Sequence, residues 1–500
     1  MKSYLLGIDI GTGGCKTTIL DSTGAFVSDG FAEYPTYHPK VGWSEQKAAS
    51  WFPAFLSSLH IALEKGSVPP SAIIALCISA SAHNAVLLDA DGSVIRDTIM
   101  WTDQRSHDES EYLKAHFSES IFRISYQTPA PTWTLPQLMW IRRNEPEVFS
   151  RIHRLMFIKD YVRYQLTGNW CTDHIEAQGS MLFDNGAWKW SEELCAIGEI
   201  PARILPPIVE PQQVSGHITR EASRFTGIPE GTPVINGATD TALEHYCVGA
   251  IEEGACVVKV ATASTVNIFG ETAQPHPSGL TYSQIPKGLW STCFATNSAA
   301  ASLRWYRDTF CAMELREEIT GGENVYSILD EEAAAVAPGS AGLFFHPHLM
   351  GERSPHWDPK LRGSFVGITA HHTRGHFNRA ILEGVAFSIK ENFEIAETLQ
   401  PVQEICLVGG GAKSRIWTGI VADVLNKPIV KFEKDDSSYG AAMLAGVGVG
   451  VFESHERAIA KCRKLIGRIQ PTPENAAAYE KAFALYCEIH ADLKKTYNKL

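Results

Sequence analysis

The sequence predicts an α/β protein with two domains, and three observations lead to that prediction. The chain has 500 residues, which exceeds the usual size of one domain, about 100–200 residues. Short β-branched runs alternate with helical patterns, which favours α/β architecture. A strand–turn–strand pattern at residues 4–21 returns at residues 255–269, half a chain later, and suggests two related halves.

The first element is a predicted β-hairpin over residues 4–21. An apolar run enters the turn Gly11-Thr12-Gly13-Gly14 and leaves as a second apolar run. The pattern at residues 255–269 has a turn of small residues around Thr262 in the corresponding place. We therefore expect two hairpins, each with a threonine at its tip.

Further strands and helices follow in alternation. The predicted strands are Ile73–Ser79, Ala85–Asp89, Gly231–Asn236 and Glu404–Val408. The predicted helices are Trp133–Arg143, Lys159–Leu166, Ala299–Phe310, Arg379–Leu399, Ile416–Asn426 and Ala476–Tyr497. A boundary near residues 249–254 divides the chain into an N-terminal domain, 1–249, and a C-terminal domain, 250–500.

Composition excludes several classes of protein. The formal net charge of −12 argues against a broad nucleic-acid surface, which needs clustered cations. No window approaches 18 uninterrupted apolar residues, and the first residues lack the pattern of a signal peptide, so we expect neither a membrane span nor secretion. The eleven cysteines form no C-x-x-C pair, which predicts reduced thiols in a cytoplasmic protein.

The glycine-rich turn at residues 11–14 offers backbone N–H groups that phosphate oxygens can approach closely. Asp9 precedes the turn, and its carboxylate suits a phosphate site only if Mg²⁺ lies between them. The alternative is an ordinary hairpin in which Asp9 stabilises the turn. A Walker A motif is excluded because Cys15 precedes Lys16 where that motif needs glycine.

Two further turns could carry chemistry. Gly409-Gly410-Gly411 ends a strand and precedes a helix, where a flat ring could approach the backbone or the strand and helix could simply pack tightly. Asp240 follows a strand and precedes a helix. An aspartate there usually caps the helix, and it can also accept a proton from a substrate hydroxyl.

A histidine-rich stretch raises the question of a metal site. Six of the eighteen histidines lie in this stretch: His346, His348, His356, His371, His372 and His376. They show no H-E-x-x-H spacing and no cysteine joins them, so we expect loop and capping roles rather than zinc binding.

Together these motifs resemble those of the FGGY carbohydrate kinases, members of the actin-like ATPase superfamily. Residues 9–13 are similar to the first phosphate loop of that family, and residues 259–266 to the second. Residues 363–384, with Gly351-Glu352-Arg353-Ser354-Pro355 before them, resemble its C-terminal signature. Residues 407–414 resemble its adenosine motif. The resemblance covers nearly the whole chain.

Within the family, the chain resembles the xylulokinases most. Residues 42–46, 81–85 and 101–105 are similar to their N-terminal segment, their sugar-contacting segment and their W-x-D-x-R stretch. Some positions depart from the family pattern. This chain has Gln137 where the family usually has Lys, Ala261 where it has Gly, Ala263 where it has Ser, and Ala82 where it has Met. Asp240 lies in Gly-Ala-Thr-Asp-Thr instead of the commoner Gly-Gly-Asp-Asn type. The last two departures leave the sugar open between a pentulose and a hexonate such as gluconate.

The resemblance implies two actin-like (ribonuclease H-like) α/β domains, an N-terminal sugar-binding one and a C-terminal nucleotide-binding one, with a cleft for sugar and nucleotide between them. It implies ATP and Mg²⁺ as cofactors, Asp240 as catalytic base and Asp9 as metal ligand. The residues expected to bind the nucleotide are Gly11, Thr12, Gly13, Lys16, Thr262, Gly410, Gly411, Ala412 and Ser414. Those expected to bind the sugar are Ala82, His83, Asn84, Trp101, Asp103 and Asp240.

The expected activity is transfer of the γ-phosphate of ATP to a hydroxyl of a ketopentose such as xylulose. The alternatives are a gluconate or other polyol kinase of the same family, and a nucleotide-binding sensor with weak catalysis, which the Cβ of Ala261 near the phosphates would favour. The expected partners are the sugar and ATP, without nucleic acid or membrane. Family members are often dimers, which leaves a homodimer open.

Overall fold

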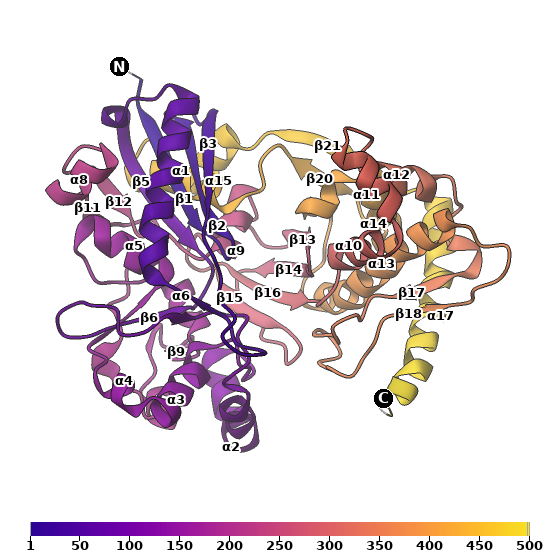
Figure 1. The fold of residues 1–500 in the computed structure, drawn as a ribbon, viewed down its shortest axis with the longest axis horizontal. Helices are drawn as coiled ribbons and strands as arrows, with labels where there is room; N and C mark the ends of the chain where they lie inside the picture. The colour runs from indigo at the N-terminus through magenta and orange to yellow at the C-terminus, as the bar shows by residue number, and fades with distance from the viewer. Residues whose placement is uncertain (1, 498, 500) are drawn as a thin grey trace. The chain divides into compact units, whose positions relative to one another are not determined.

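The computed structural model describes residues 2–497 and 499, which form two compact α/β units (Figure 1). Unit 1 holds the chain up to Ile251 together with Tyr282–Leu289 and Lys434–Lys464. Unit 2 holds Glu252–Thr281, Trp290–Glu433 and the chain from Leu465 onward. The chain thus first leaves unit 1 two residues after the expected boundary. Two later segments return to it, which a single boundary in the sequence does not describe.

Unit 1 is built on a six-stranded sheet. Its strands run in the order β11 (Val214–His217), β12 (Pro233–Ile235), β5 (Ile73–Ala80), β1 (Tyr4–Ile10), β2 (Gly14–Asp21) and β3 (Phe26–Glu33). β1 pairs antiparallel with β2 and parallel with β5, and β12 is also parallel to β5. The predicted hairpin and both predicted strands at β5 and β12 are confirmed, and the central parallel strands end on the same side of the sheet.

Helices cover both faces of this sheet. On one face, α1 (Trp51–Gly66) packs against β2 and β3, and α5 (Ile158–Thr167) packs against β5. On the other face, α9 (Asp240–Cys247) and α15 (Ser437–Gly448) pack against the central strands and each other. Alternation along β1 sends Leu6 and Ile8 into the first core and Leu5 into the second, as a strand buried on both faces requires.

The remaining elements of unit 1 lie around this sheet. The strands are β4 (Glu45–Gln46), β6 (Ala85–Leu88), β7 (Thr98–Ile99), β8 (Arg154–Phe157), β9 (Phe183–Asp184) and β10 (Lys189–Trp190). The helices are α2 (His107–Ser125), α3 (Thr134–Asn144), α4 (Pro146–Ser150), α6 (His174–Gly179), α7 (Glu192–Gly198), α8 (Arg220–Thr226) and α16 (His455–Cys462). β6, α3 and α5 confirm the predicted elements there, with ends shifted by one residue.

Unit 2 is built on a seven-stranded sheet. Its order is β15 (Leu280–Ser283), β16 (Trp290–Ala295), β14 (Ser264–Gly270), β13 (Cys256–Val260), β19 (Ile405–Val408), β20 (Ile429–Phe432) and β21 (Leu465–Ile469). β13 and β14 form the second predicted hairpin, and β13 is parallel to β19. β17 (Phe344–His346) and β18 (Ser364–Val366) form a separate antiparallel pair.

The helices of unit 2 enclose one large hydrophobic core. They are α10 (Ala300–Phe310), α11 (Ala312–Ile319), α12 (Val325–Ala334), α13 (Arg374–Leu399), α14 (Arg415–Leu425) and α17 (Pro473–Tyr497). α13 begins five residues before its predicted start, because Thr373 and His376 form a reciprocal capping box at its N-terminus. The other predicted helices of this unit are confirmed within three residues at each end.

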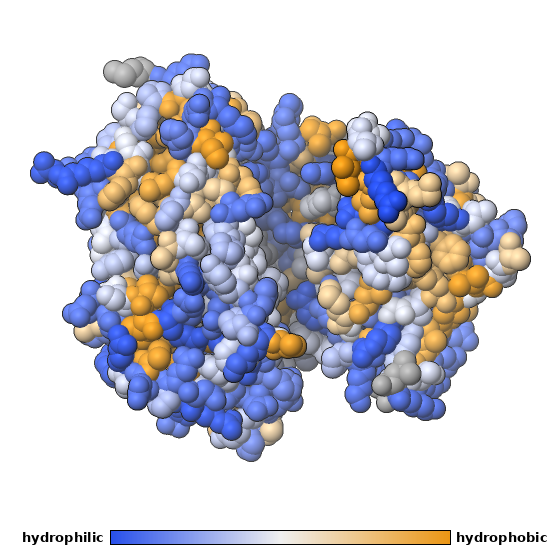
Figure 2. Space-filling view, viewed as in Figure 1, coloured by the Kyte–Doolittle hydropathy of each residue, from blue (hydrophilic) through white to orange (hydrophobic). Residues whose placement is uncertain are grey.

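The surface in Figure 2 is mainly hydrophilic within each unit, with hydrophobic residues in small separate patches. None of the helices in the described part of the chain is long and apolar enough to cross a membrane. All eleven cysteines lie among the described residues and are free thiols, nine of them buried.

Candidate functional site

The tip of the first hairpin combines one packed glycine with one open glycine. The N–H of Gly11 donates to the carbonyl of Gly14 over 3.0 Å and closes the turn. A Cβ on Gly14 would lie 2.6 Å from the Phe31 ring, whereas a Cβ on Gly13 would meet no atom within 4 Å. The backbone at Gly13 is therefore accessible, as a phosphate-binding turn requires.

Thr12 is fixed at this tip by three side chains. Gln46 Nε2 donates to its carbonyl over 2.7 Å, and the Thr36 hydroxyl donates to the same oxygen over 3.3 Å. Trp101 Nε1 donates to the Thr12 hydroxyl over 3.2 Å. The predicted phosphate residue Thr12 and the predicted sugar residue Trp101 are thus brought together.

Asp9 lies at the end of β1, just before the tip. The pKa of Asp9 is raised to about 6, mainly by burial and then by nearby Asp240 and Asp436, against the hydroxyls of Ser437 and Ser79, which lower it. Its Oδ1 atom is buried and accepts no hydrogen bond from residues 2–497. A buried carboxylate oxygen without a donor beside a second carboxylate is a site where a cation would lower the free energy.

Asp240 is the first residue of α9, and it does not cap that helix. Thr239 is the N-cap, with its hydroxyl accepting from the N–H of Ala242 over 3.4 Å. Asp240 Oδ1 accepts from the N–H of Thr241 over 2.7 Å. Capping, the usual role of an aspartate at such a junction, is thus taken by its neighbour. The carboxylate of Asp240 lies close enough to raise the pKa of Asp9.

Lys16 is directly opposite Asp9 in the β1–β2 register. Its ammonium group lies 3.1 Å from a carboxylate oxygen of Asp436 and 4.0 Å from Asp29. About a third of the Lys16 side chain is exposed. Its ion pair holds the N-terminus of α15 against β2, and its role toward a nucleotide stays a prediction.

The predicted sugar segment forms a strained turn after β5. His83 has a φ of 48° and a buried ring, and Ala82 beside it is partly exposed. The N–H of His83 donates to Glu176, and its carbonyl accepts from the Thr134 hydroxyl over 2.8 Å. The His83 ring lies 4.9 Å from that of Trp133. These contacts hold the turn in a backbone conformation that few residues adopt.

Asn84 and Trp101 differ in their access to a ligand. Asn84 is fully buried, with its Nδ2 donating to the Ser81 carbonyl over 2.8 Å and its Oδ1 accepting from the N–H of Trp101 over 2.6 Å. The Asn84 amide therefore joins the two predicted sugar segments to each other. Trp101 is 38% exposed and is not a core aromatic. Its indole is available as one wall of a sugar site.

Asp103, one of the residues expected to bind the sugar, forms a buried ion pair with Arg105. Its carboxylate accepts two hydrogen bonds from the Arg105 guanidinium, over 2.9 and 2.8 Å, and one from the N–H of Ser44 over 2.5 Å. Arg105 also lies 2.6 Å from Glu45 and stacks on Trp43. Asp103 is only 1% exposed, so the pair shapes the loop that carries Trp101.

The buried ring of His83 predicts a pH dependence of stability. Burial lowers the pKa of His83 to about 3, against 6.5 in the unfolded chain. The unfolded state therefore gains a proton first on acidification, and stability present above pH 6.5 is lost as the pH falls toward 3. Between pH 7.5 and pH 5 the wild type is expected to lose about 2 kcal/mol more than His83→Gln, measured by urea unfolding.

The comparison with His83→Gln isolates this one ring. Burial raises the pKa of the neighbouring Glu176 well above its ordinary value, which changes stability in the opposite direction on acidification. Glu176 is present in both proteins, so its effect cancels in the difference. Parallel stability curves for the two proteins across this pH range would contradict the prediction.

The second hairpin, in unit 2, has its tip closed by backbone bonds. The N–H of Ala261 donates to the carbonyl of Ala263 over 3.0 Å, and the Thr262 carbonyl accepts from Ala299 and Ala301 at the start of α10. Arg304 Nη2 lies 3.4 Å from the Thr262 hydroxyl. Thr262 is therefore placed beside the N-terminus of a helix, where anions are stabilised.

The three-glycine turn of unit 2 has one buried and one open glycine. Gly409 has a φ of 89°, and a Cβ on Gly411 would lie 2.4 Å from Val260 Cγ1. A Cβ on Gly410 would meet no atom within 4 Å. The Ala412 carbonyl accepts from Lys431, and the Ser414 hydroxyl caps α14 by accepting from the N–H of Trp417 over 3.1 Å. Gly410 thus leaves backbone accessible, as binding of a flat ring requires.

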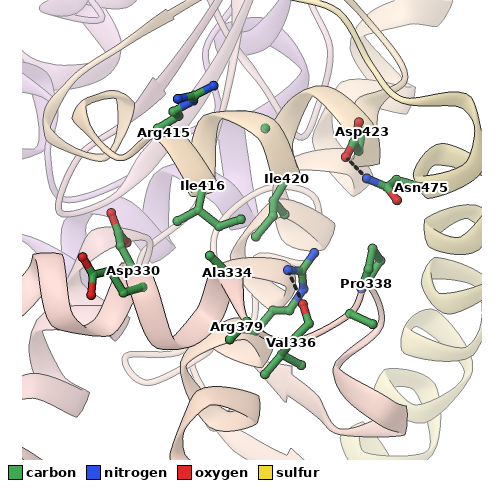
Figure 3. A pocket seen from close by; sticks show the side chains of 14 residues that line it. Asp330, Ala334, Val336, Pro338, Arg379, Arg415, Ile416, Ile420, Asp423 and Asn475 are labelled. Carbon is green, nitrogen blue, oxygen red and sulfur yellow. Dashed lines mark hydrogen bonds between the residues drawn. The ribbon is translucent and has the colours of Figure 1, made fainter.

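A cavity of about 780 Å³ lies beside this turn, within unit 2 (Figure 3). Ile416 and Ile420 project into it from α14, opposite Ala334 and Val336. Polar groups stand at its edges: Asp330, Arg415, and Asp423, whose carboxylate accepts from Asn475 over 2.8 Å. Burial raises the pKa of Asp330, opposed by the Ser414 hydroxyl. Apolar walls with a few polar groups are typical of a small-molecule site.

Sequence reasoning missed a buried charge cluster behind Asp240. The ammonium of Lys159 lies 2.6 Å from Asp160 and 2.8 Å from Asp173, and Arg163 bonds both Asp160 and the Asn236 carbonyl. Asn236 follows β12 directly, so the cluster supports the strand end that leads to Asp240. Lys159, Asp160 and Arg163 share α5, but Asp173 and Asn236 come from other parts of the chain, so no single spacing in the sequence identifies the whole cluster.

Two other expectations have a structural outcome. Gln137, where lysine was expected, is buried, and its Nε2 is 3.3–3.4 Å from the backbone carbonyls of Met100, Pro131 and Thr132. His372 and His376 have the expected loop and capping roles. His346, His348 and His356 instead form a cluster with His490, which lies far away in the sequence.

Comparisons with known proteins agree across the chain. A curated xylulose kinase of Bacillus subtilis is 31% identical over 495 residues, covering 98% of this chain and 97% of its own. The crystal structure of xylulose kinase from Rhodospirillum rubrum matches with a TM-score of 0.90 at 27% identity, covering 99% of this chain and 100% of that one. The crystal structure of gluconate kinase from Lactobacillus acidophilus matches with a TM-score of 0.91 at 28% identity, covering 100% of both chains.

Family models describe both parts of the chain. The N-terminal domain of the FGGY family of carbohydrate kinases matches residues 4–247, and its C-terminal domain matches residues 257–449. Each match contains one of the two hairpins, and the second also contains the three-glycine turn. With its two sheet-containing α/β domains, the chain belongs to the FGGY family of carbohydrate kinases, which transfer phosphate from ATP to an alcohol group of a sugar.

Proposed function

We propose that this chain phosphorylates a ketopentose such as xylulose, with Asp240 as general base. The observation that carries the proposal is the placement of Asp240: its neighbour Thr239 caps the helix, while Asp240 lies close to Asp9 and the open phosphate turn. The carboxylate would accept the proton of the sugar hydroxyl. The hydroxyl oxygen would bond to the γ-phosphorus as the bond to the β-phosphate oxygen breaks, releasing ADP.

Asp9 is the residue we propose to hold Mg²⁺. Its donor set suits a hard cation, because Oδ1 is buried without a hydrogen-bond donor and the carboxylate of Asp240 is near. A bound Mg²⁺ would neutralise phosphate charge. Thr12 and the open backbone at Gly13 would bind phosphate oxygens directly. The predicted roles of Gly11 and Lys16 follow from their places on the same turn and strand.

The nucleoside end of ATP is assigned to unit 2. The open face of Gly410 and the cavity between α12 and α14 provide a flat backbone surface next to apolar walls. Asp330 and Arg415 at the rim offer polar contacts to a base or a ribose. Gly411 and Ala412 form the floor of this turn, and Ser414 contributes by capping α14.

Gly410→Leu tests the nucleoside assignment. Because a Cβ there would meet no atom within 4 Å, the free energy of unfolding should change by less than about 1 kcal/mol. The same side chain would obstruct the nucleotide, so KM for ATP should rise at least ~10-fold, a loss of about 1.4 kcal/mol. Steady-state kinetics at saturating sugar and urea unfolding give the two values.

Gly411→Ala is the matched control for this substitution. Its Cβ would meet Val260 at 2.4 Å, so this variant should lose stability. An unchanged KM for ATP in Gly410→Leu would show that the nucleoside does not bind at this turn.

A neutral sugar fits the candidate residues better than gluconate does. Burial lowers the pKa of His83 to about 3, so the ring is uncharged at neutral pH. The cation nearest to Asp103, Arg105, is fully buried in its bonds to Asp103 and Glu45. None of these candidate sugar residues offers an available positive charge to a sugar carboxylate, whereas the exposed Trp101 indole can lie against a sugar ring or chain.

The experiment is an ADP-release assay with xylulose, other pentuloses, hexuloses, polyols and gluconate at matched concentrations. The proposal expects sugar-stimulated ADP release with kcat/KM highest for a pentulose. A kcat/KM at least tenfold higher for gluconate than for the pentuloses would show that the proposed substrate is wrong, but it would still support a sugar kinase. ATP binding without stimulation by any sugar would favour the sensor.

A further inference from the structure

A cluster of mostly buried histidines lies in unit 2, among residues that have no role in the proposed function. His356 belongs to the loop after Ser354, Glu391 to α13, and His490 to α17. One ligand atom of each, two imidazole nitrogens and one carboxylate oxygen, lies within 4.8 Å of the others. Three distant parts of the sequence thus bring metal-binding atoms to one point.

Three polar atoms at this point are buried and have no hydrogen-bond partner among the described residues. These are Nε2 of His356, Nε2 of His490 and Oε2 of Glu391. His356 Nε2 is 3.3 Å from Glu391 Oε1, but the geometry does not make a hydrogen bond. The rings of His356 and His490 stack at 4.3 Å and 20°. Leaving such groups unpaired lowers the stability of the fold, so a ligand that satisfies all three would stabilise it.

The other ring nitrogen of His490 takes part in a series of side-chain contacts through His348 to Glu352. His490 Nδ1 is 3.1 Å from His348 Nε2, and His348 Nδ1 is 3.1 Å from Glu352 Oε2. If His490 Nδ1 carries the proton, it donates to His348, which in turn donates to Glu352. That arrangement leaves the lone pair of His490 Nε2 facing Glu391. Orientation of a ligating histidine by a partner on its second nitrogen is typical of metal sites.

We propose that His356, Glu391 and His490 bind one divalent transition-metal ion of the Zn²⁺ type. Two imidazole nitrogens and a carboxylate oxygen suit Zn²⁺ and not Mg²⁺, which prefers oxygen ligands alone. Tetrahedral bonds of about 2.0–2.1 Å would place the donor atoms about 3.3 Å from one another, against separations of up to 4.8 Å at present. Water would fill the fourth position.

The site would join the C-terminal helix to a loop that reaches the main sheet of unit 2. Glu352, four residues before His356, accepts from the N–H of Asn297, which closely follows β16. Arg353 donates to the Thr296 carbonyl over 2.7 Å. A metal ion held by His356 and His490 would therefore fix α17 and this loop to one point on α13, a structural role independent of the proposed kinase activity.

Metal binding to untagged full-length protein tests the proposal. After exposure to ZnCl₂ and desalting, we expect one zinc per chain by elemental analysis and a raised unfolding temperature that EDTA reverses. Co²⁺ in place of zinc should give the intense visible absorption of a tetrahedral site, a readout that does not depend on activity.

His490→Gln and Glu391→Gln should each abolish the stoichiometric metal and the Co²⁺ spectrum. The matched control is His371→Gln, at an exposed histidine outside the cluster, which should keep both. Far-ultraviolet circular dichroism checks folding, and the conservative Glu391→Gln serves if His490→Gln misfolds. Less than 0.2 equivalents of metal in the wild type, or equal binding in the wild type and both cluster variants, would overturn the proposal.

Discussion

Asp240→Asn is expected to lower turnover by ~10²–10⁴-fold, the range for loss of a positioned general base. The amide keeps the size of the carboxylate but cannot accept the proton of the sugar hydroxyl. Stability should hardly change, because Thr239 and not Asp240 caps α9. The decrease should appear in kcat, with KM for ATP nearly unchanged, because the lost interaction acts in the transition state.

The measurement is steady-state ADP release at saturating ATP and sugar. Glu244→Gln removes a carboxylate from the same helix one turn later, outside the candidate site, and should retain turnover within about threefold. Turnover of Asp240→Asn within threefold of the wild type would assign the base to another residue. Equal unfolding midpoints for the three proteins would exclude misfolding as the cause.

Gly237→Ala is expected to lower the free energy of unfolding by at least about 2 kcal/mol. Gly237 has a φ of +78°, which costs a residue with a side chain about 1–2 kcal/mol. Its Cβ would also lie 1.9 Å from the carbonyl oxygen of Ile78 on β5, so the backbone must move. Such overpacking adds about 1–3 kcal/mol. Activity should fall as well, because the displaced turn carries Asp240.

Gly231→Ala separates the cost of the positive φ from the cost of the steric overlap with Ile78. Gly231, at the other end of β12, has a φ of +86°, but its Cβ would meet no atom within 4 Å. It should therefore cost only about 1 kcal/mol. Urea unfolding of both variants gives the comparison, and equal losses at the two positions would show that the contact with Ile78 does not matter.

The elements near each site could be predicted from the sequence because their signals are local. Apolar runs around Gly11–Gly14 define the first hairpin, and a small-residue turn around Thr262 defines the second. The start of α13 at Arg374 could not be found from apolar spacing, because it depends on the capping box of Thr373 and His376. Side-chain caps move helix ends by several residues without changing the hydrophobic pattern.

The roles of individual site residues were harder to predict than their positions. Asn84 has the polar side chain that a sugar site needs, yet its amide is bonded to Ser81 and Trp101. Asp103 is similarly engaged by Arg105. Whether a polar side chain faces a ligand or its own chain depends on tertiary contacts. The groups around His490 show the same limit, since α17 brings it to His356 across more than a hundred residues.

The return of Lys434–Lys464 to unit 1 has a consequence for synthesis on the ribosome. α15, within this segment, covers one face of the first sheet so closely that a Cβ on Gly7 would lie 1.9 Å from the Ser438 carbonyl. At about 5–20 residues per second, translation from Ile251 to Lys464 takes roughly ten to forty seconds. During that interval α9 is already made but α15 is not, so the part of the apolar sheet face that α15 covers stays exposed to solvent in the nascent N-terminal half.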